Sequence, residues 1–347
     1  MTEPVPEARR APVGLSDRSA FQTSLKFLGP QWFAIVMGWA GLAQAWHRAV
    51  PLMGEEAHWF AVAAAIVAAA MFALVCAALV WRMRLHPAAL AEDLAHPLRH
   101  PFAAALPVSM LLLALAALTV GGGGPAARTV AHLLFWPGAA LQFAASVWVI
   151  GRIVRLRLEW PAVTPVLFIP IVGNVVVPLP ALLLGAPELG WFFLGIGAFF
   201  WPIATTLNFV RTAQLPVPDR IAPSWTILAA PPALVGIDLI ALGGPPQVGF
   251  AMLGIAALFV AIALLKLHAT AGTGFSIAWW GISFPFAAFT TLLELLAVDA
   301  VGLRVVAIAS LAAVSLAVLW LSSATWKALR AGTLLAPEPV AMMKPAD

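Results

Sequence analysis

Long apolar runs separated by short charged connections are the feature that most constrains this chain. The run over residues 58–81 reads HWFAVAAAIVAAAMFALVCAALVW and contains no Asp, Glu, Lys or Arg. Over the whole chain, 62% of the residues are apolar and 10% are charged, whereas a soluble domain carries about 25% charged residues. These residues cannot cover a water-facing surface, so we expect an all-α integral membrane protein with lipid-facing helices.

The apolar runs can be counted, because a transmembrane helix needs about 20 mostly apolar residues. The sequence predicts ten spans, over residues 30–47, 58–81, 104–120, 130–150, 163–184, 190–209, 226–242, 247–265, 276–297 and 301–326. Short connections rich in Gly and Pro separate them. We interpret residues 1–26 and 327–347 as cytoplasmic tails and 27–326 as one membrane domain.

Lys and Arg are distributed unevenly between the connections. Of the 19 in the chain, Arg48, Arg128 and Arg304 fall on the side away from the N-terminus, and the rest fall on the N-terminal side. Cytoplasmic connections of membrane proteins carry such an excess. The pattern predicts that both ends are cytoplasmic, which requires an even number of spans and agrees with ten. It also accounts for the net charge of +4 without a nucleic-acid partner.

Prolines gather in alternate spans. They occur in the odd-numbered ones, with Pro137 and Pro202 as exceptions in the fourth and sixth. A proline within a helix removes one backbone hydrogen bond and kinks it, and the freed carbonyl needs a partner that lipid cannot supply. We therefore expect five helical hairpins, each with a bent inner helix and a straight outer helix, arranged around a central pore.

Five segments in order along the chain resemble the tellurite-resistance/dicarboxylate transporter family, which includes plant slow anion channels. They are FLGPQWFAIVMGWAGLAQAW from Phe27, HPLRHPFAAALPVSMLLL from His96, FIPIVGN continuing to GWFFLGIGAFFW, LAAPPA, and FSIAWWGISFPFAAFTTLL from Phe275. The resemblance covers about Phe27 to Trp326. It implies a homotrimer in a bacterial inner membrane, with a separate pore in each subunit lined by the odd-numbered helices.

The resemblance also implies that a phenylalanine on the ninth helix plugs the pore. The matching residue is Phe284, directly before the proline of SFPF, with Phe286 and Phe289 as alternatives. A phenyl ring in a narrow apolar passage blocks ions sterically and excludes water. The alternative is that the ring simply packs against a neighbouring helix. Other candidates on the odd-numbered helices would line the pore: Phe33, Pro107, Asn174, Pro231, Ser283, Pro285 and Thr291.

Charged side chains offer two further functional candidates. Asp238 and Glu294 lie within the seventh and ninth spans, where carboxylates are candidates for proton binding; the alternative places them at the interface in contact with water. Arginines on the cytoplasmic side could raise the local anion concentration at the inner mouth, or could serve topology alone. They are Arg82, Arg84, Arg99, Arg152, Arg155, Arg157 and Arg211.

The sequence thus favours a channel for small anions, gated by Phe284. A proton-coupled carrier of an organic or inorganic anion, of the malate, sulfite or tellurite type, is the alternative. The chain contains none of the Walker, GxSxG or HExxH patterns, so we expect neither an enzyme nor an ATP-driven pump. The seven histidines and the single Cys76 suggest no haem, other cofactor or metal site.

Overall fold

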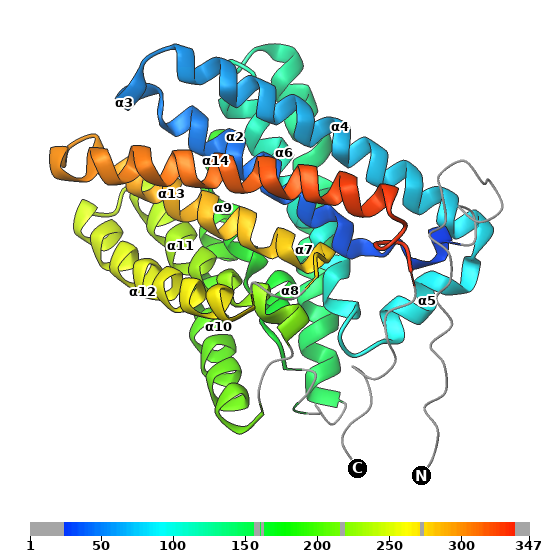
Figure 1. The fold of residues 1–347 in the computed structure, drawn as a ribbon. Coiled ribbons are helices and arrows are strands. Elements are labelled where there is room, and N and C mark those ends of the chain that lie inside the picture. Colours follow the sequence, from blue (N-terminus) through cyan, green and yellow to red (C-terminus); the bar gives the residue numbers. More distant parts are fainter. Residues whose placement is uncertain (1–23, 156–159, 161–162, 216–218, 271–273, 337–347) are drawn as a thin grey trace, which may run out of the picture.

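The computed structural model describes residues 24–336 apart from 156–159, 161–162, 216–218 and 271–273 (Figure 1). Residues 1–23 and 337–347 of the predicted tails lie outside this part. The described residues form helices and no strand, which confirms the predicted all-α class. Nine helical segments among them are long and apolar enough to cross a membrane.

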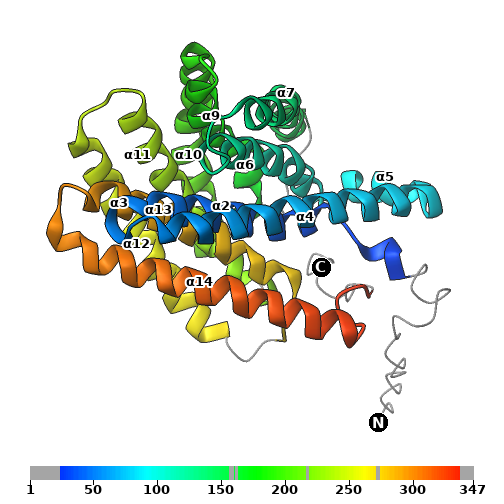
Figure 2. The ribbon, with the colours of Figure 1, turned by 90° about the horizontal axis from the view of Figure 1, so that it is seen from above.

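Five long helices form the outer layer. In each, only 17–33% of the most apolar stretch is buried, and large apolar side chains such as Trp59, Leu133 and Leu265 are exposed. This is the arrangement expected of helices that face lipid. Figure 1 shows α4 and α14 on the surface, and Figure 2 shows α7 at the edge opposite α14. The outer helices are α4 (Glu56–Leu85), α7 (Pro125–Arg155), α10 (Pro187–Gln214), α12 (Pro246–Thr270) and α14 (Val301–Arg330).

Five inner segments alternate with the outer helices along the chain, and each begins with a 3₁₀ helix that continues as an α-helix. Four of them have 61–78% of their most apolar stretch buried. The segments are η2 (Pro30–Trp32) with α2 (Phe33–Arg48); η3 (His100–Ala104) with α6 (Ala105–Thr119); η5 (Pro165–Leu167), α8 (Phe168–Val172), η6 (Gly173–Val176) and α9 (Pro178–Leu183); η7 (Asp219–Ala229) with α11 (Ala230–Ala241); and η8 (Ile277–Ile282) with α13 (Ser283–Ala297).

The first inner segment differs from the other four in length. Its α-helix, α2, has 16 residues, fewer than the ~20 of a full span. Nevertheless, α2 is the inner helix of its hairpin, because most of its residues are buried and it contacts α4, α6 and α13. The predicted count of ten spans therefore stays a prediction, with nine spans identified in the described residues.

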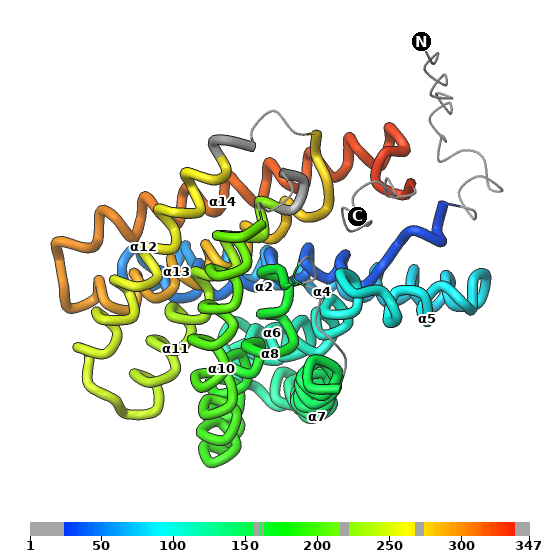
Figure 3. Tube along the Cα trace, turned by 90° about the horizontal axis from the view of Figure 1, so that it is seen from below, coloured from blue at the N-terminus to red at the C-terminus, as the bar shows by residue number. Residues whose placement is uncertain are grey.

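The inner segments form a closed ring. The α2 helix contacts α6 on one side and α13 on the other; α6 contacts α9, and α11 contacts both α9 and α13. Each inner segment also packs against the outer helix that follows it in the chain. Figure 3 shows the outer helices α7, α10, α12 and α14 towards the periphery. The ring is what positions the candidate site, because it encloses the central axis.

Prolines mark the places where the inner segments change from 3₁₀ to α-helix. Pro107, Pro231 and Pro285 each lie within the first three residues of an α-helix, where the missing N–H has no helical partner to lose. In the third inner segment, Pro178 begins α9 after η6, and Pro170 lies within the short helix α8. The buried, proline-bearing segments thus agree with the expected inner helices. In place of a kink within the helix, the structure has a change from 3₁₀ to α-helix near the start of the segment.

The side of the molecule on which the inner segments begin is called here the near side, and two further short helices lie there. Helix α5 (Pro87–Ala95) follows α4 there, and η1 (Leu25–Phe27) precedes the first inner segment. The opposite side, where the inner segments end, is called the far side. It carries α3 (Val50–Met53) and turns at Gly122, Gly185 and Gly243, whose positive φ angles suit glycine.

Candidate functional site

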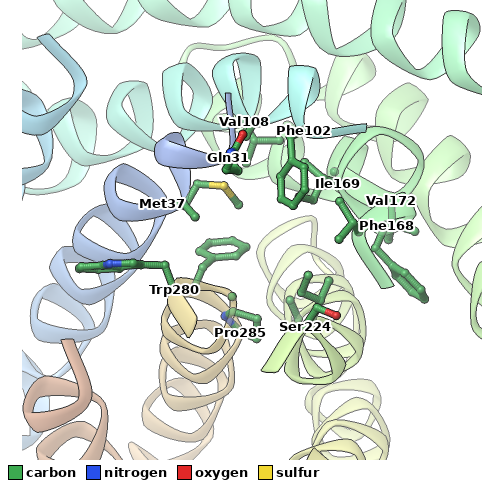
Figure 4. Close-up of a pocket in the computed structure, with 18 of the residues that line it drawn as sticks. Gln31, Met37, Phe102, Val108, Phe168, Ile169, Val172, Ser224, Trp280 and Pro285 are labelled. Atoms are coloured by element: carbon green, nitrogen blue, oxygen red, sulfur yellow. The ribbon is translucent and has the colours of Figure 1, made fainter. Parts of the chain in front are cut away.

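The ring of inner segments encloses a near cavity of about 250 Å³. Its wall comes from the N-terminal parts of all five segments, and Figure 4 shows Met37, Phe102, Ile169, Trp280 and Pro285 around it. Most of these side chains are apolar. The polar side chains that line it are Gln31, Arg99, Thr164, Ser224 and Ser276.

A far cavity of about 210 Å³ lies at the C-terminal ends of the same segments. It is more polar than the near cavity. Gln44 and Thr119 are hydrogen-bonded across it, because Gln44 Nε2 donates to Thr119 Oγ1 at 3.1 Å. The polar and charged side chains that line the far cavity are Gln44, His47, Arg48, Thr119, Asp238 and Thr291.

Four residues line both cavities and therefore separate them: Val175, Val176, Leu234 and Phe284. All four are apolar, and Phe284 has the largest side chain among them. The Phe284 residue is 9% exposed. An apolar constriction of this kind excludes water and ions as long as its side chains stay in place.

Hydrogen bonds and close packing fix the turn that carries Phe284. The Trp280 indole Nε1–H donates to Thr325 Oγ1 of α14 at 2.8 Å, and Ser283 Oγ donates to the Trp280 carbonyl at 2.7 Å. From α2, Gly41 packs against Phe284, and a Cβ on Gly41 would lie 3.1 Å from Phe284 Cδ2. The absence of a side chain at Gly41 leaves the space in which the phenyl ring sits.

The predicted pore-lining residues divide into two groups. Pro231 and Pro285 line the near cavity, and Thr291 lines the far cavity. Phe33 instead packs against Phe72 of α4, with ring centroids 5.7 Å apart. Pro107 is buried in α6.

Asn174 and Ser283, which were expected to present donors to the pore, form hydrogen bonds elsewhere. Asn174 Nδ2 donates to Ser146 Oγ of α7 at 2.8 Å, so the amide faces the outer helix. Ser283 is fully buried and is bonded within its own turn. Neither Asn174 nor Ser283 is among the described residues that line the two cavities. Thr290, next to Thr291 on α13, forms a hydrogen bond with Ser310 of α14, and their hydroxyl oxygens are 2.7 Å apart.

The two alternative gate residues lie away from the constriction. Phe286 is partly buried against the apolar cluster that includes Phe33 and Trp280. Phe289 is partly buried against Ala288, Leu293 and their neighbours. Neither is among the described residues that line the two cavities. The geometry thus separates Phe284 from its two neighbours on α13.

Asp238 and Glu294 are buried rather than in contact with surface water. Asp238 is 2% exposed and lines the far cavity, and Glu294 is 1% exposed. Asp238 Oδ2 and both Glu294 carboxylate oxygens have no hydrogen-bond partner among the described residues. Burial of a carboxylate without a partner is costly, so such groups mark functional candidates. The Arg48 guanidinium interacts electrostatically with Glu294.

The sequence pattern does not identify Arg48 as a residue of the far cavity, because it places Arg48 in the connection after the first predicted span. The signal that finds it is helical spacing along α2, where Ala34, Met37, Gly41, Gln44 and Arg48 recur every three or four residues and all line a cavity. A stripe of this kind marks the face of a helix that turns towards one neighbour or cavity.

No group of three or more His, Cys, Asp or Glu side chains that could hold a metal ion occurs in the described part of the chain. Of the arginines expected at the near mouth, Arg99 lines the near cavity, Arg82 and Arg211 are buried, and Arg157 lies outside the described residues.

A family model described as SLAC1, voltage-dependent anion channel, matches residues 28–326, which include all five hairpins. The comparison with individual curated proteins gives no significant match.

Proposed function

This chain belongs to the voltage-dependent anion channel family, and we propose that it passes small anions along the axis of its inner ring, with Phe284 as the gate. The family implies anion transport and therefore a protein embedded in a membrane. The observation that carries the gate is that Phe284 lines both cavities and so lies in the partition between them. The proposal is that the two cavities become one passage when the ring moves aside.

The polar groups of the far cavity support the choice of an anion. Arg48 provides a fixed positive charge there, and the Gln44 amide has a second N–H besides the one that it donates to Thr119. Hydrogen-bond donors with little fixed charge bind an ion weakly, which favours rapid passage over tight capture.

Reversal potentials test the proposed activity. Purified protein in a planar lipid bilayer is bathed in a tenfold gradient of potassium chloride, and potassium is then replaced by a large organic cation. We expect the reversal potential to follow the chloride gradient and to be unaffected by the cation. A reversal potential that follows potassium, or a complete lack of current from both wild-type and Phe284→Ala protein, would contradict an anion channel.

A proton-coupled anion carrier is the second candidate, and the unpartnered buried carboxylates of Asp238 and Glu294 favour it. Vesicle uptake after a pH jump distinguishes the two. A carrier takes up anion only with the pH gradient and saturates, and Asp238→Asn or Glu294→Gln abolishes the dependence on the gradient. A channel passes current without a pH gradient, and these variants retain it.

The proposal also includes the membrane in which the protein lies and its oligomeric state. We infer a multi-pass protein of a bacterial inner membrane with both termini cytoplasmic, which the excess of Lys and Arg on the near side supports. The homotrimer, with one pore in each subunit, rests on the resemblance to the tellurite-resistance/dicarboxylate transporter family. Cross-linking or mass measurement of the purified protein tests the trimer.

A further inference from the structure

Three charged side chains form a cluster on the near side of the molecule. Asp93 of α5 accepts from Arg82 Nη1 at 2.7 Å through Oδ2 and from Arg99 Nη1 at 2.9 Å through Oδ1. The side chains of Arg82 and Asp93 are 3% exposed, whereas that of Arg99 is 32% exposed. One carboxylate therefore serves two guanidinium groups, and the cluster keeps an excess positive charge.

Arg82 has a structural role within this cluster. Its Nε donates to the Lys26 carbonyl at 2.9 Å and its Nη2 to the Ala89 carbonyl at 3.3 Å. These bonds tie the end of α4 to η1 and to α5. Arg152 of α7 holds the other end of α5, because its Nη2 donates to the Ala95 carbonyl at 2.9 Å. Helix α5 is therefore anchored to two outer helices.

Arg99 differs from Arg82 in three respects. It lines the near cavity, its side chain is partly accessible, and its buried Nε has no hydrogen-bond partner among the described residues. A buried N–H of a charged group without a partner is unfavourable and calls for a ligand or water. Within the wall of the near cavity, Arg99 is the only described residue with a full positive charge.

We propose that Arg99 captures anions at the near cavity, held in place by Asp93 on the anchored helix α5. The ligand is a small monovalent anion, and a planar oxyanion such as nitrate suits the guanidinium best, because two N–H groups can bind two oxygens. The largely apolar wall favours an anion that loses its hydration easily. This inference rests on the proposed function, since capture serves passage to the gate.

Currents with nitrate varied on one side of a bilayer test the proposal. With the Phe284→Ala change present in every protein, Arg99→Gln should raise the half-saturating nitrate concentration on the near side about fivefold or more. The far-side value should change little. Arg84→Gln is the matched control, because Arg84 is an exposed arginine at the end of α4 that does not line the cavity. Equal near-side values for Arg99→Gln and Arg84→Gln would overturn the proposal.

Arg99→Lys provides a second test, which keeps the charge and the pairing with Asp93. It should retain the half-saturating value for chloride and raise that for nitrate about twofold, because an ammonium group lacks the planar fork. Unchanged values for both anions would contradict capture by the guanidinium.

Binding without transport separates this inference from the proposed function. Nitrate should raise the Tm of wild-type protein in detergent, and the rise should be lost in Arg99→Gln but not in Arg84→Gln. A lack of current together with this loss would refute the channel and retain the anion site. Anion current together with equal shifts in both variants would refute the site and retain the channel.

Discussion

A Cβ atom on Gly41 of α2 would lie 3.1 Å from Cδ2 of Phe284 on α13, so a side chain at Gly41 would press against the Phe284 ring. The two residues belong to adjacent inner segments that close the ring. Because Gly41 also lines the far cavity, a side chain there would project into the proposed passage.

Gly41→Val should therefore lower current only when the passage is open. In the Phe284→Ala background the isopropyl group occupies part of the vacated space, and we expect the conductance to fall about threefold or more. Gly195→Val is the matched control, since no atom lies within 4 Å of a Cβ at Gly195 on the outer helix α10. Equal effects of the two substitutions on single-channel conductance would contradict the geometry.

Arg48, which lines the far cavity, should influence ion selectivity more than Glu294, which lines neither cavity. Arg48→Gln removes the positive charge that lines the far cavity, and the ratio of anion to cation permeability should fall severalfold. Glu294 lines neither cavity, so Glu294→Gln should change the ratio less than Arg48→Gln does. Reversal potentials in a salt gradient measure both, with Arg128→Gln as an exposed control on the same side. A ratio in Arg48→Gln equal to that of wild type would show that the Arg48 charge does not act on the permeating ion.

The hydrogen bond between Trp280 and Thr325 should stabilise the fold. Thr325→Val keeps the shape of the side chain but leaves the buried indole N–H of Trp280 without its acceptor. We expect the free energy of unfolding to fall by about 1–3 kcal/mol. Denaturant unfolding in detergent measures it. Thr206→Val is the matched control, because that hydroxyl is exposed and bonds only within its own helix; an equal loss there would contradict the assignment.

His96 should make the near side sensitive to acid. Burial, and after it the charge of Arg99, lowers the pKa of His96 below its ordinary value of 6.5, and the Leu98 backbone N–H donates to its Nδ1 at 3.1 Å. The unfolded chain therefore binds a proton more readily than the folded one. The resulting stability is complete above pH ~6.5 and is lost as the pH falls through the lowered value.

The same substitution at two histidines checks this pH dependence. His96→Gln should flatten the decline of Tm between about pH 7 and pH 5, whereas His132→Gln, at an exposed position on α7, should leave the decline as in wild type. An identical decline in all three proteins would exclude His96 as its source.

The sequence supported the layered fold better than the details of the site. Prolines and apolar runs distinguish most inner segments from outer ones, because lipid offers no partner to a backbone carbonyl that a proline frees. Pro137 and Pro202, inside the outer helices α7 and α10, are the exceptions. Which face of an inner helix meets the axis depends on its rotation. Asn174 shows this, because its amide bonds to Ser146 on α7 rather than facing a cavity.

The sequence pattern does not predict two other features, for related reasons. The 3₁₀ starts of the inner segments shift the helical period, so a face extrapolated from one half of a segment does not hold in the other. Arg48 ends α2 and was counted with the following connection, yet it lines the far cavity. Whether a residue at the end of a helix is assigned to the helix or to the connection depends on where the helix ends to within one turn. Hydropathy does not locate helix ends that closely.

The conductance of Phe284→Ala in lipid bilayers tests the central claim most directly, because the ring lies in the partition between the two cavities. We expect anion conductance to rise about tenfold or more over wild type, and Phe286→Ala and Phe289→Ala to leave it at the wild-type level. A Phe284→Ala conductance equal to that of wild type, or an equal rise in either neighbouring variant, would contradict Phe284 as the gate.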